Sequence, residues 1–405
     1  MSEAAASSGR SPTSAGVAKV EAPGRRASVR VCIGGADVTE RLLRHLISMK
    51  CTDNDEDEAD DLELVLQDRG GLWSEEWLTD AVDAAAGVQS DQGIAPYGQN
   101  DAAAGVSDSG GETGLEISAA ILVHNWRNDG KTEELDCGSY TLDSVEYTGP
   151  PAVLTMRATS LTFASQIRQT RKSKAWESYY LSGIAGEMAE SVGMSVQFLA
   201  ERDPYYEREE QYKESDIAFL KRLCHNAGLS LKSYDKTLVL FDQRAYEARE
   251  PAVTIRKRTE AHSADPERDY LSWNFQIGTA DTQYTSCRVS YYDPETGATI
   301  EGIAWAEDYD AEKDKNDQRL EITAKVSSEG EALALAGKLL RLHNKLCRTV
   351  EFVLPGNPAL AAGMTIRLAG WGGWDGKYII TQAAHTVDGE GFTTQITARR
   401  VIEGY

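Results

Sequence analysis

The chain has 405 residues and a mass of 44.3 kDa, with 64 acidic against 42 basic residues and a formal net charge of −22. This length suggests two or three domains, and an apolar fraction of 41% is enough to build sizeable cores. So acidic a chain is a poor general binder of nucleic acid or of anionic membranes. No apolar run approaches the roughly 18–20 residues that would span a bilayer.

The six cysteines lie far apart and form no C-x-x-C pair. Each lies in an apolar or strand-like stretch: Cys32, Cys51, Cys137, Cys224, Cys287 and Cys347. We therefore expect buried, reduced thiols in a protein made in a cytosol, although an even number of cysteines also permits disulfides.

The N-terminal part of the chain predicts an arm followed by a β region. Residues 1–27 are rich in Ala, Ser, Gly and Pro without periodicity, which is typical of a disordered arm. From Ser28 short strand-like runs alternate with turns, so residues 28–160 are expected to form a first β-barrel. A stretch of Gly, Ser, Asp, Gln and Ala at about residues 87–114 indicates an exposed insertion.

The middle of the chain, residues 161–248, changes to a helical period. Apolar residues recur at helical spacing over residues 181–192 and 217–227, and Gly193 and Gly228 end the two predicted helices. Each predicted helix is followed by a strand-like run. The pattern predicts a small α+β domain.

The β character returns in residues 249–405, which are expected to form a second β-barrel. One helix is predicted within it at about residues 329–346, with Leu333, Ala336, Leu340 and His343 on one face. The fold class is therefore α+β and mainly β, with two barrels on either side of the small α+β domain.

The two β regions look related by duplication, although chance similarity between two hairpins is an alternative. The matched segments are residues 138–142 with 376–380, 156–158 with 396–398, and 114–117 with 363–366. A chain with two copies of one barrel has a consequence for assembly. Three such chains would present six similar barrels, which is a pseudo-sixfold ring built with threefold symmetry.

No motif predicts a catalytic residue, a cofactor site or a metal site. The glycine-rich stretch at residues 370–376 has Asp375 in place of the third glycine of a dinucleotide loop, and it is interpreted as a turn. The aspartates between Asp53 and Asp57 have the spacing of a calcium loop. Because Glu58 stands where that loop needs glycine, a solvated acidic turn is the better interpretation.

Three stretches of the sequence resemble a known family. They are the hairpin at residues 138–160, the segment Glu214-Ser-Asp-Ile-Ala-Phe-Leu-Lys-Arg-Leu223, and residues 354–394 with Trp374-Asp-Gly-Lys-Tyr378. Together they lie across most of residues 28–402. In them the chain is similar to late-control protein D, the baseplate hub protein of contractile phage tails and of related contractile injection systems.

The resemblance implies a structural protein that is not an enzyme and needs no cofactor. It would act as a homotrimeric, pseudo-sixfold adaptor that joins a hexameric tail tube to a trimeric central spike. The implied partners are the tail tube protein or a tube initiator, a separate central spike protein and other baseplate proteins. Sequence-specific nucleic-acid binding and membrane insertion are not expected. The implied location is the baseplate of a virion or tail-like particle, after synthesis and assembly in the bacterial cytoplasm.

Four aromatic residues are candidate interface anchors because they lie near predicted loops: Trp371, Trp374, Tyr378 and Tyr140. A place in the barrel cores is the alternative for each of them. Two other functions stay open. The paired helix–Gly–strand units resemble peptidoglycan-binding repeats, and some hub assemblies carry lytic domains, although no active-site motif supports a lytic tail component here.

Overall fold

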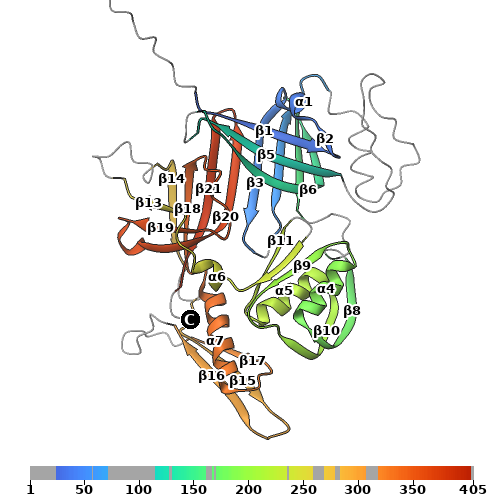
Figure 1. Ribbon diagram of the computed structural model, residues 1–405, viewed down its shortest axis with the longest axis vertical. Coiled ribbons are helices and arrows are strands. Elements are labelled where there is room, and N and C mark those ends of the chain that lie inside the picture. The colour runs from blue at the N-terminus through green and yellow to red at the C-terminus, as the bar shows by residue number, and fades with distance from the viewer. Residues whose placement is uncertain are drawn as a thin grey trace, which may run out of the picture.

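The computed structural model describes residues 24–56, 58–71, 115–126, 130–160, 167, 170–234, 237–258, 269–278, 283–306 and 318–402. The predicted arm lies outside these residues as far as residue 23, and strand β1 (Arg26–Ile33) begins two residues before the expected start at Ser28. The predicted insertion at about residues 87–114 also lies outside them. The molecule is elongated, with one large sheet at one end and two smaller units at the other (Figure 1).

A 13-stranded sheet forms the large end of the molecule, and the main path through it contains eleven strands. Their order is β14 (Ser272–Ile277), β18 (Arg348–Pro355), β21 (Gly391–Arg400), β20 (Gly376–Asp388), β3 (Leu46–Asn54), β4 (Asp61–Gln67), β7 (Val153–Thr159), β6 (Thr132–Thr148), β5 (Glu116–His124), β1 and β2 (Ala36–Asp37). Strand β19 (Thr365–Ala369) pairs with β20, and β13 (Val253–Arg256) pairs with β19. The short helix α1 (Thr39–Leu43) follows β2.

The strands form because their apolar residues alternate with polar ones. In β4, for example, Leu62, Leu64 and Leu66 are buried, while the residues between them are half-buried. The buried faces enclose two cores. Strands β1 and β3–β7 line the first core, and strands β13, β14 and β18–β21 line the second.

The structure confirms the duplication at the level of strand register. Strands β5-β6-β7-β4 and β19-β20-β21-β18 have the same order, and every pairing within both sets is antiparallel. Tyr140 lies opposite Ile117 in the first set, as Tyr378 lies opposite Ile366 in the second. These are the pairs that the sequence alignment placed at equivalent positions.

Both central hairpins also carry a β-bulge at the same place. The register shifts between Leu142 and Ser144 in β6, and between Ile380 and Gln382 in β20. Since a bulge adds one unpaired residue at a specific point, two copies in equivalent positions argue for a common origin. We call the two sets, with the strands that flank them, the first and second β modules.

The two β modules belong to one continuous sheet because β20 pairs with β3 over Gln382–Asp388 and Ser48–Asn54. The far end of the β20–β21 hairpin reaches the first core, where Val387 and Phe392 are buried. The predicted class, mainly β with an α+β unit between two β modules, is thus confirmed. No pairing that closes either module into a barrel occurs among the described strands, so barrel closure stays a prediction.

The α+β unit contains both predicted helices. Its elements are β8 (Arg171–Tyr180), α4 (Leu181–Glu190), β9 (Ser195–Leu199), β10 (Tyr205–Ser215), α5 (Asp216–Asn226), β11 (Ser230–Tyr234), β12 (Thr237–Phe241) and α6 (Arg244–Glu247). Gly193 and Gly228 take the positive φ that ends a helix, at 71° and 68°. The side chain of Ser215 caps α5 by accepting from the Ala218 N–H at 3.4 Å.

A fourth unit divides the region that was expected to form only a second barrel. Strands β15 (Ser286–Tyr292), β16 (Thr299–Trp305) and β17 (Arg319–Thr323) form their own sheet, which helix α7 (Glu329–Asn344) covers. This α7 unit has a separate core that includes Cys287, Val289, Ala336 and Leu340. The sequence pattern did not separate these strands from those of the module because all of them alternate in the same way.

The predicted face of α7 was wrong at Leu333, which is 50% exposed, whereas Ala332 is buried. The reason is Gly302 on β16. A Cβ at this position would lie 2.2 Å from the backbone nitrogen of Leu333, so the helix backbone packs directly on the glycine. This close approach turns Ala332 and Ala336, rather than Leu333, toward the sheet.

Candidate functional site

Two of the predicted interface residues, Tyr140 and Tyr378, lie at equivalent places in the two β modules. Both are buried, and each phenol donates to the backbone oxygen of a residue three or four positions earlier in the chain. The acceptors are Cys137 O at 2.5 Å and Trp374 O at 2.9 Å. Burial raises the pKa of both phenols. As buried residues they offer little surface to a partner, and their interface role stays an untested prediction.

The other two, Trp371 and Trp374, belong to an aromatic cluster under strand β14. Trp371 is buried and donates from Nε1 to Ile255 O at 3.1 Å. Trp374 is half-buried, with its ring 4.9 Å from that of Phe275, at the end of the turn η3 (Gly372–Trp374). The aromatic residue with the largest open surface here is Trp273 on β14, which is 51% exposed and which the sequence did not single out.

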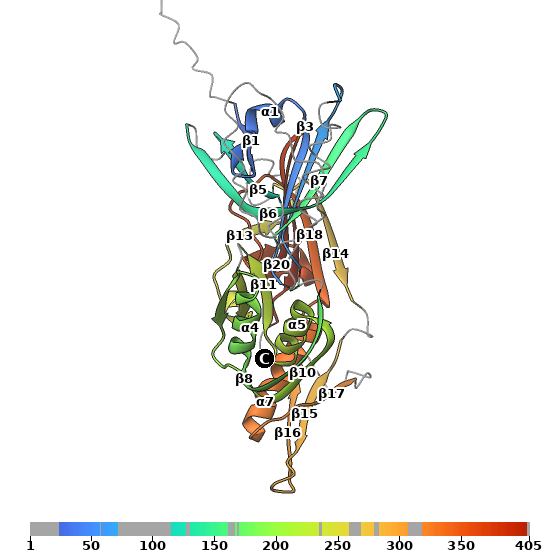
Figure 2. The same ribbon diagram turned by 90° about the vertical axis from the view of Figure 1, so that its right-hand side faces the viewer.

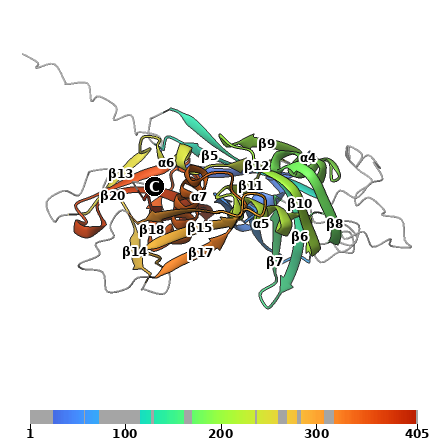
Figure 3. The same cartoon turned by 90° about the horizontal axis from the view of Figure 1, so that it is seen from below.

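Strands β14 and β6 each present an edge of the large sheet that has no partner strand among the described residues, as does the short strand β13. Strand β14 pairs with β18 on one side only. Strand β6 pairs with β7 up to Thr148, but on its other side β5 ends opposite Thr141. Figure 1 and Figure 3 both show β14 toward the left and β6 toward the right of the large sheet.

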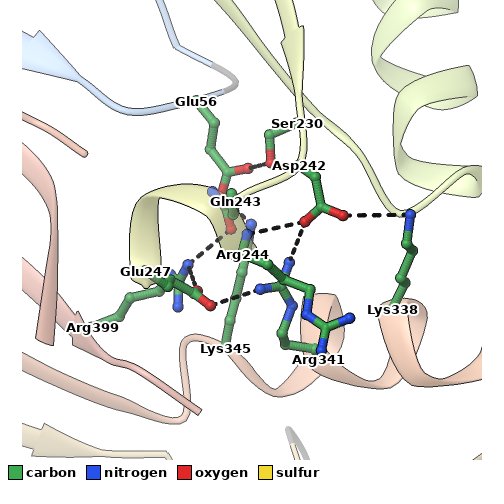
Figure 4. A network of polar contacts seen from close by, with 10 residues as sticks. All are labelled: Glu56, Ser230, Asp242, Gln243, Arg244, Glu247, Lys338, Arg341, Lys345 and Arg399. Carbon is green, nitrogen blue, oxygen red and sulfur yellow. Dashed lines mark hydrogen bonds and ion pairs between the residues drawn. The ribbon is translucent and has the colours of Figure 1, made fainter. Parts of the chain in front are cut away.

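A buried network of charges joins all four units (Figure 4). Glu56, in the turn between β3 and β4, accepts from Ser230 of the α+β unit and from Lys345 at the end of α7. Burial alone would raise the pKa of Glu56, but the Lys345 charge and the two hydrogen bonds outweigh it and lower that pKa. The first module is therefore held to the α+β unit and to α7 by one carboxylate.

Glu247 of α6 is the second centre of this network. Its two oxygens accept from Arg399 of β21 at 2.5 Å and from Arg341 of α7 at 2.7 Å. Arg399 is 1% exposed and also donates to Gln243 at 2.8 Å. Burial lowers the pKa of Arg341, which reflects the cost of keeping its charge out of water. The second module, the α+β unit and α7 thus meet at one carboxylate.

Asn54, Asp55 and Asp60 of the acidic turn at residues 53–60 are buried and Glu58 is exposed, so the expectation of a solvated turn was wrong for the buried aspartates. Lys232 on β11 reaches into it and donates to Asp53 at 2.5 Å and to Asn54 O at 2.6 Å. Asp57 lies outside the described residues. Burial raises the pKa of Asp55 and of Asp60 to about 7 each. This burial could not be predicted from the sequence, since the partner lysine is 179 residues away from Asp53 in the chain.

A cavity of about 430 Å³ lies beside this turn, where residues of both β modules face the α+β unit. Its lining includes Cys51, Cys137, Lys232 and His385. The imidazole of His385 is fixed by contacts with Thr394 Oγ1 at 3.1 Å and Leu360 O at 2.9 Å, and burial lowers its pKa. Among the described residues, no group of three or more His, Cys, Asp or Glu side chains could hold a metal ion.

The sequence profile of the phage tail baseplate hub (GPD) family matches residues 131–391, which is more than half of the chain. The chain belongs to this family. The match starts at the first module and ends in the β20–β21 hairpin, so it includes the α+β unit and the α7 unit. The resemblance stated from the sequence is thereby confirmed.

Two curated hub-family relatives align with parts of this chain. The probable baseplate hub protein of Escherichia phage P2 is 29% identical over 130 residues, or 30% of this chain and 32% of the relative. The probable baseplate hub protein of Escherichia phage 186 is 24% identical over 201 residues, or 49% of this chain and 41% of the relative. The matches span less than half of either relative.

One solved structure similar to this hub-family chain is the 43 kDa tail protein of prophage MuSo2 from Shewanella oneidensis. It matches with a TM-score of 0.58 and 13% identity over 92% of this chain and 98% of that one. The likeness concerns the fold. In the described part of this chain, no helix has the length and apolar character needed to cross a membrane.

Proposed function

We propose that this chain is the structural baseplate hub of a contractile tail. Three copies would close into a pseudo-sixfold ring that joins a hexameric tail tube to a trimeric central spike. Membership of the hub family supports the role, and the duplicated modules support the symmetry. Two equivalent modules per chain allow three chains to present six similar surfaces.

The observation that carries this proposal is the junction between the two modules within one chain. Strand β3 of the first module pairs there with β20 of the second. The equivalent of β3 in the second module is β14, because β3 pairs with β4 and β14 pairs with β18, and β4 and β18 occupy equivalent positions beside β7 and β21. The equivalent of β20 in the first module is β6. The same junction between two chains would therefore pair β14 of one copy with β6 of the next.

Both strands named by this equivalence have an open edge among the described residues. An open edge exposes backbone N–H and C=O groups that a further strand satisfies. Strand β14 also exposes apolar side chains, with Trp273 at 51% and Ile277 at 56%. Pairing β14 with β6 would cover these side chains and repeat a contact that the chain already makes internally. Continued around three copies, the pairing closes a ring.

The test is the mass of the purified protein in solution, measured by light scattering on a size-exclusion column. We expect three times the chain mass of 44.3 kDa. The N–H of Gly278 donates to Cys347 O, so by the alternation of an antiparallel ladder the N–H of Ile277 points away from β18. The variant Ile277→Pro should then yield monomers with an unchanged circular dichroism spectrum.

The matched control is Ile277→Val, which keeps both the N–H and a β-branched side chain and should remain trimeric. A wild-type protein that is monomeric at every concentration tested would refute the ring. A trimer that Ile277→Pro leaves intact would refute the β14–β6 junction.

The partners and the location follow from the same proposal. We propose contacts with the tail tube protein or a tube initiator, with a separate central spike protein and with other baseplate proteins, in a virion or tail-like particle. Co-expression with the neighbouring tail proteins should yield a complex that contains three copies of this chain. We also propose that the chain catalyses no reaction. Clearing of a peptidoglycan zymogram, or binding to purified sacculi, would instead favour the lytic or cell-wall-binding alternative.

A further inference from the structure

Two cysteines that are 86 residues apart in the chain meet inside the first β module. The Sγ atoms of Cys51 on β3 and Cys137 on β6 are 2.9 Å apart. In the sheet, β4 and β7 lie between these strands. At about 4.8 Å per strand the two would be roughly 14 Å apart on a flat sheet, so the contact exists because the module curls over its core.

The backbone around Cys137 is shaped so that its thiol faces Cys51. Gly138 lies opposite Ala119 and Asp136 lies opposite Ala120, which leaves Cys137 as the extra residue of a β-bulge. The carbonyl of Cys137 also accepts from the buried Tyr140 phenol at 2.5 Å. Gly138 follows with a φ of 92°, a conformation that side chains disfavour. These features fix the cysteine in place.

Both cysteines line the cavity of about 430 Å³ where the two β modules face the α+β unit. Cys51 is 5% exposed and Cys137 is half-buried, so a small reagent has to reach them through this cavity. The contact with Cys51 and burial together raise the pKa of Cys137 well above its ordinary value. The thiol form is therefore favoured at neutral pH, and reaction with an oxidant is faster at higher pH.

We propose that Cys51 and Cys137 are an oxidisable pair that forms a disulfide when the protein meets a low-molecular-weight disulfide such as oxidised glutathione. One cysteine attacks the reagent, forms a mixed disulfide and releases one glutathione thiol. The second cysteine then attacks the mixed disulfide and releases the second glutathione thiol. The protein pair is oxidised, the glutathione disulfide is reduced, and the two protein protons end on the two released thiols.

The disulfide would stabilise the curved conformation of the first module. It ties β3 to β6 across the two intervening strands and closes a loop of 86 residues, a length at which a crosslink strongly restricts the unfolded chain. Such a disulfide forms where reductants are scarce, outside the cell in which the protein is made. It goes beyond the hub role, since it holds whether the chain is a monomer or part of a ring.

The experiment uses the full chain, first reduced and desalted, then incubated at pH 8 with oxidised glutathione. We expect a mass loss of about 2 Da, a crosslinked peptide that contains Cys51 and Cys137, and a rise in Tm on the order of 5 °C that a reductant reverses. Differential alkylation of the native wild type gives a readout that needs no variant. Both thiols should disappear together.

Two variants provide the control. Cys51→Ala should abolish the mass loss and the rise in Tm. The matched variant Cys224→Ala changes a thiol that is equally buried, but in the core of the α+β unit, and should keep both effects. A stable glutathione adduct on Cys51 or Cys137, or two alkylatable thiols at these positions after incubation, would overturn the proposal.

Discussion

The carboxylate of Glu247 offers a direct test of the buried charge network. Glu247→Gln keeps the shape of the side chain but removes its charge. Arg399 would then keep Gln243 as its neutral partner, and Arg341 would keep Asp242 at 3.4 Å. Both guanidinium groups stay buried, with exposed fractions of 1% and 5%. Arg399 therefore loses its carboxylate partner, and Arg341 is left with the longer contact to Asp242 alone.

Removing one partner of a buried ion pair costs about 3–5 kcal/mol. Since Glu247 serves two arginines, we expect a loss at or above the middle of this range, measured as the free energy of unfolding in urea. At 2–4 °C per kcal/mol for domains of 150–250 residues, the Tm should fall by roughly 8 to 20 °C. The three units that meet at Glu247 should also become more susceptible to proteolysis at their connections.

The matched control is Glu187→Gln, which removes a carboxylate that pairs with Lys174 on the surface, where both side chains are more than 40% exposed. Exposed pairs contribute little, so this variant should stay within about 1 kcal/mol of the wild type. If Glu247→Gln were no more destabilising than Glu187→Gln, the view that one carboxylate joins the second module, the α+β unit and α7 would be refuted.

Two further predictions concern the packing of α7 and the acidic turn. Gly302→Ala would force a methyl group against the backbone of Leu333 and should lower the free energy of unfolding in urea by about 1–3 kcal/mol. The control Gly337→Ala in α7 has room for a methyl group and should raise that free energy by up to about 1 kcal/mol. Equal effects of the two substitutions would contradict the packing of α7 on Gly302. The pKa values of Asp55 and Asp60 are raised in the folded state from 3.8 to about 7. The free energy of unfolding should therefore fall as pH rises from about 4 to about 7, by up to about 1.4 kcal/mol per pH unit for each carboxyl, and level off above. Asp55→Asn should flatten this dependence, and an unchanged profile would contradict it.

Local features were predictable from the sequence because their causes are local. The helices α4 and α5 follow from apolar residues at helical spacing and from a glycine that takes positive φ just after each helix. The duplication was visible because Gly138 and Gly376 both begin a repeat segment with a positive φ, which few other residues adopt. A backbone conformation of this kind selects the residue type, so it can be recognised in the sequence.

Features that depend on contacts between distant parts of the chain could not be predicted from the sequence. The β8–β10 ladder is exposed and heavily charged, so it shows no apolar alternation. The partners of the acidic turn, Lys232 and Lys345, lie 179 and 289 residues away from Asp53 and Glu56. A count of charges shows that the chain is acidic, but it does not show which carboxylates are buried with a cation.

The two modules have the same strand order and register but different side chains at equivalent positions. Register equivalence places Cys51 of the first module where Phe275 stands in the second, and Trp374 lies one residue before the equivalent of Cys137. A sulfur pair thus joins β3 to β6 in the first module, and in the second module rings 4.9 Å apart join β14 to the turn η3 just before β20. The smaller side chains of the first module leave the cavity that faces the α+β unit.

In the proposed trimer, this divergence would allow one chain to meet partners of different symmetry. The strand edges, where the modules are alike, would give the proposed trimer six similar contacts around its ring. The α+β unit and the α7 unit both lie beyond one end of the sheet (Figure 2), and each occurs once per chain. At that end a trimer presents three copies of each unit, because each occurs once among the described residues of the chain, and the acidic turn whose carboxylates bind Lys232 of the α+β unit belongs to the first module. Duplication would thus supply the sixfold character at one end, and the differences between the copies would supply the threefold character at the other.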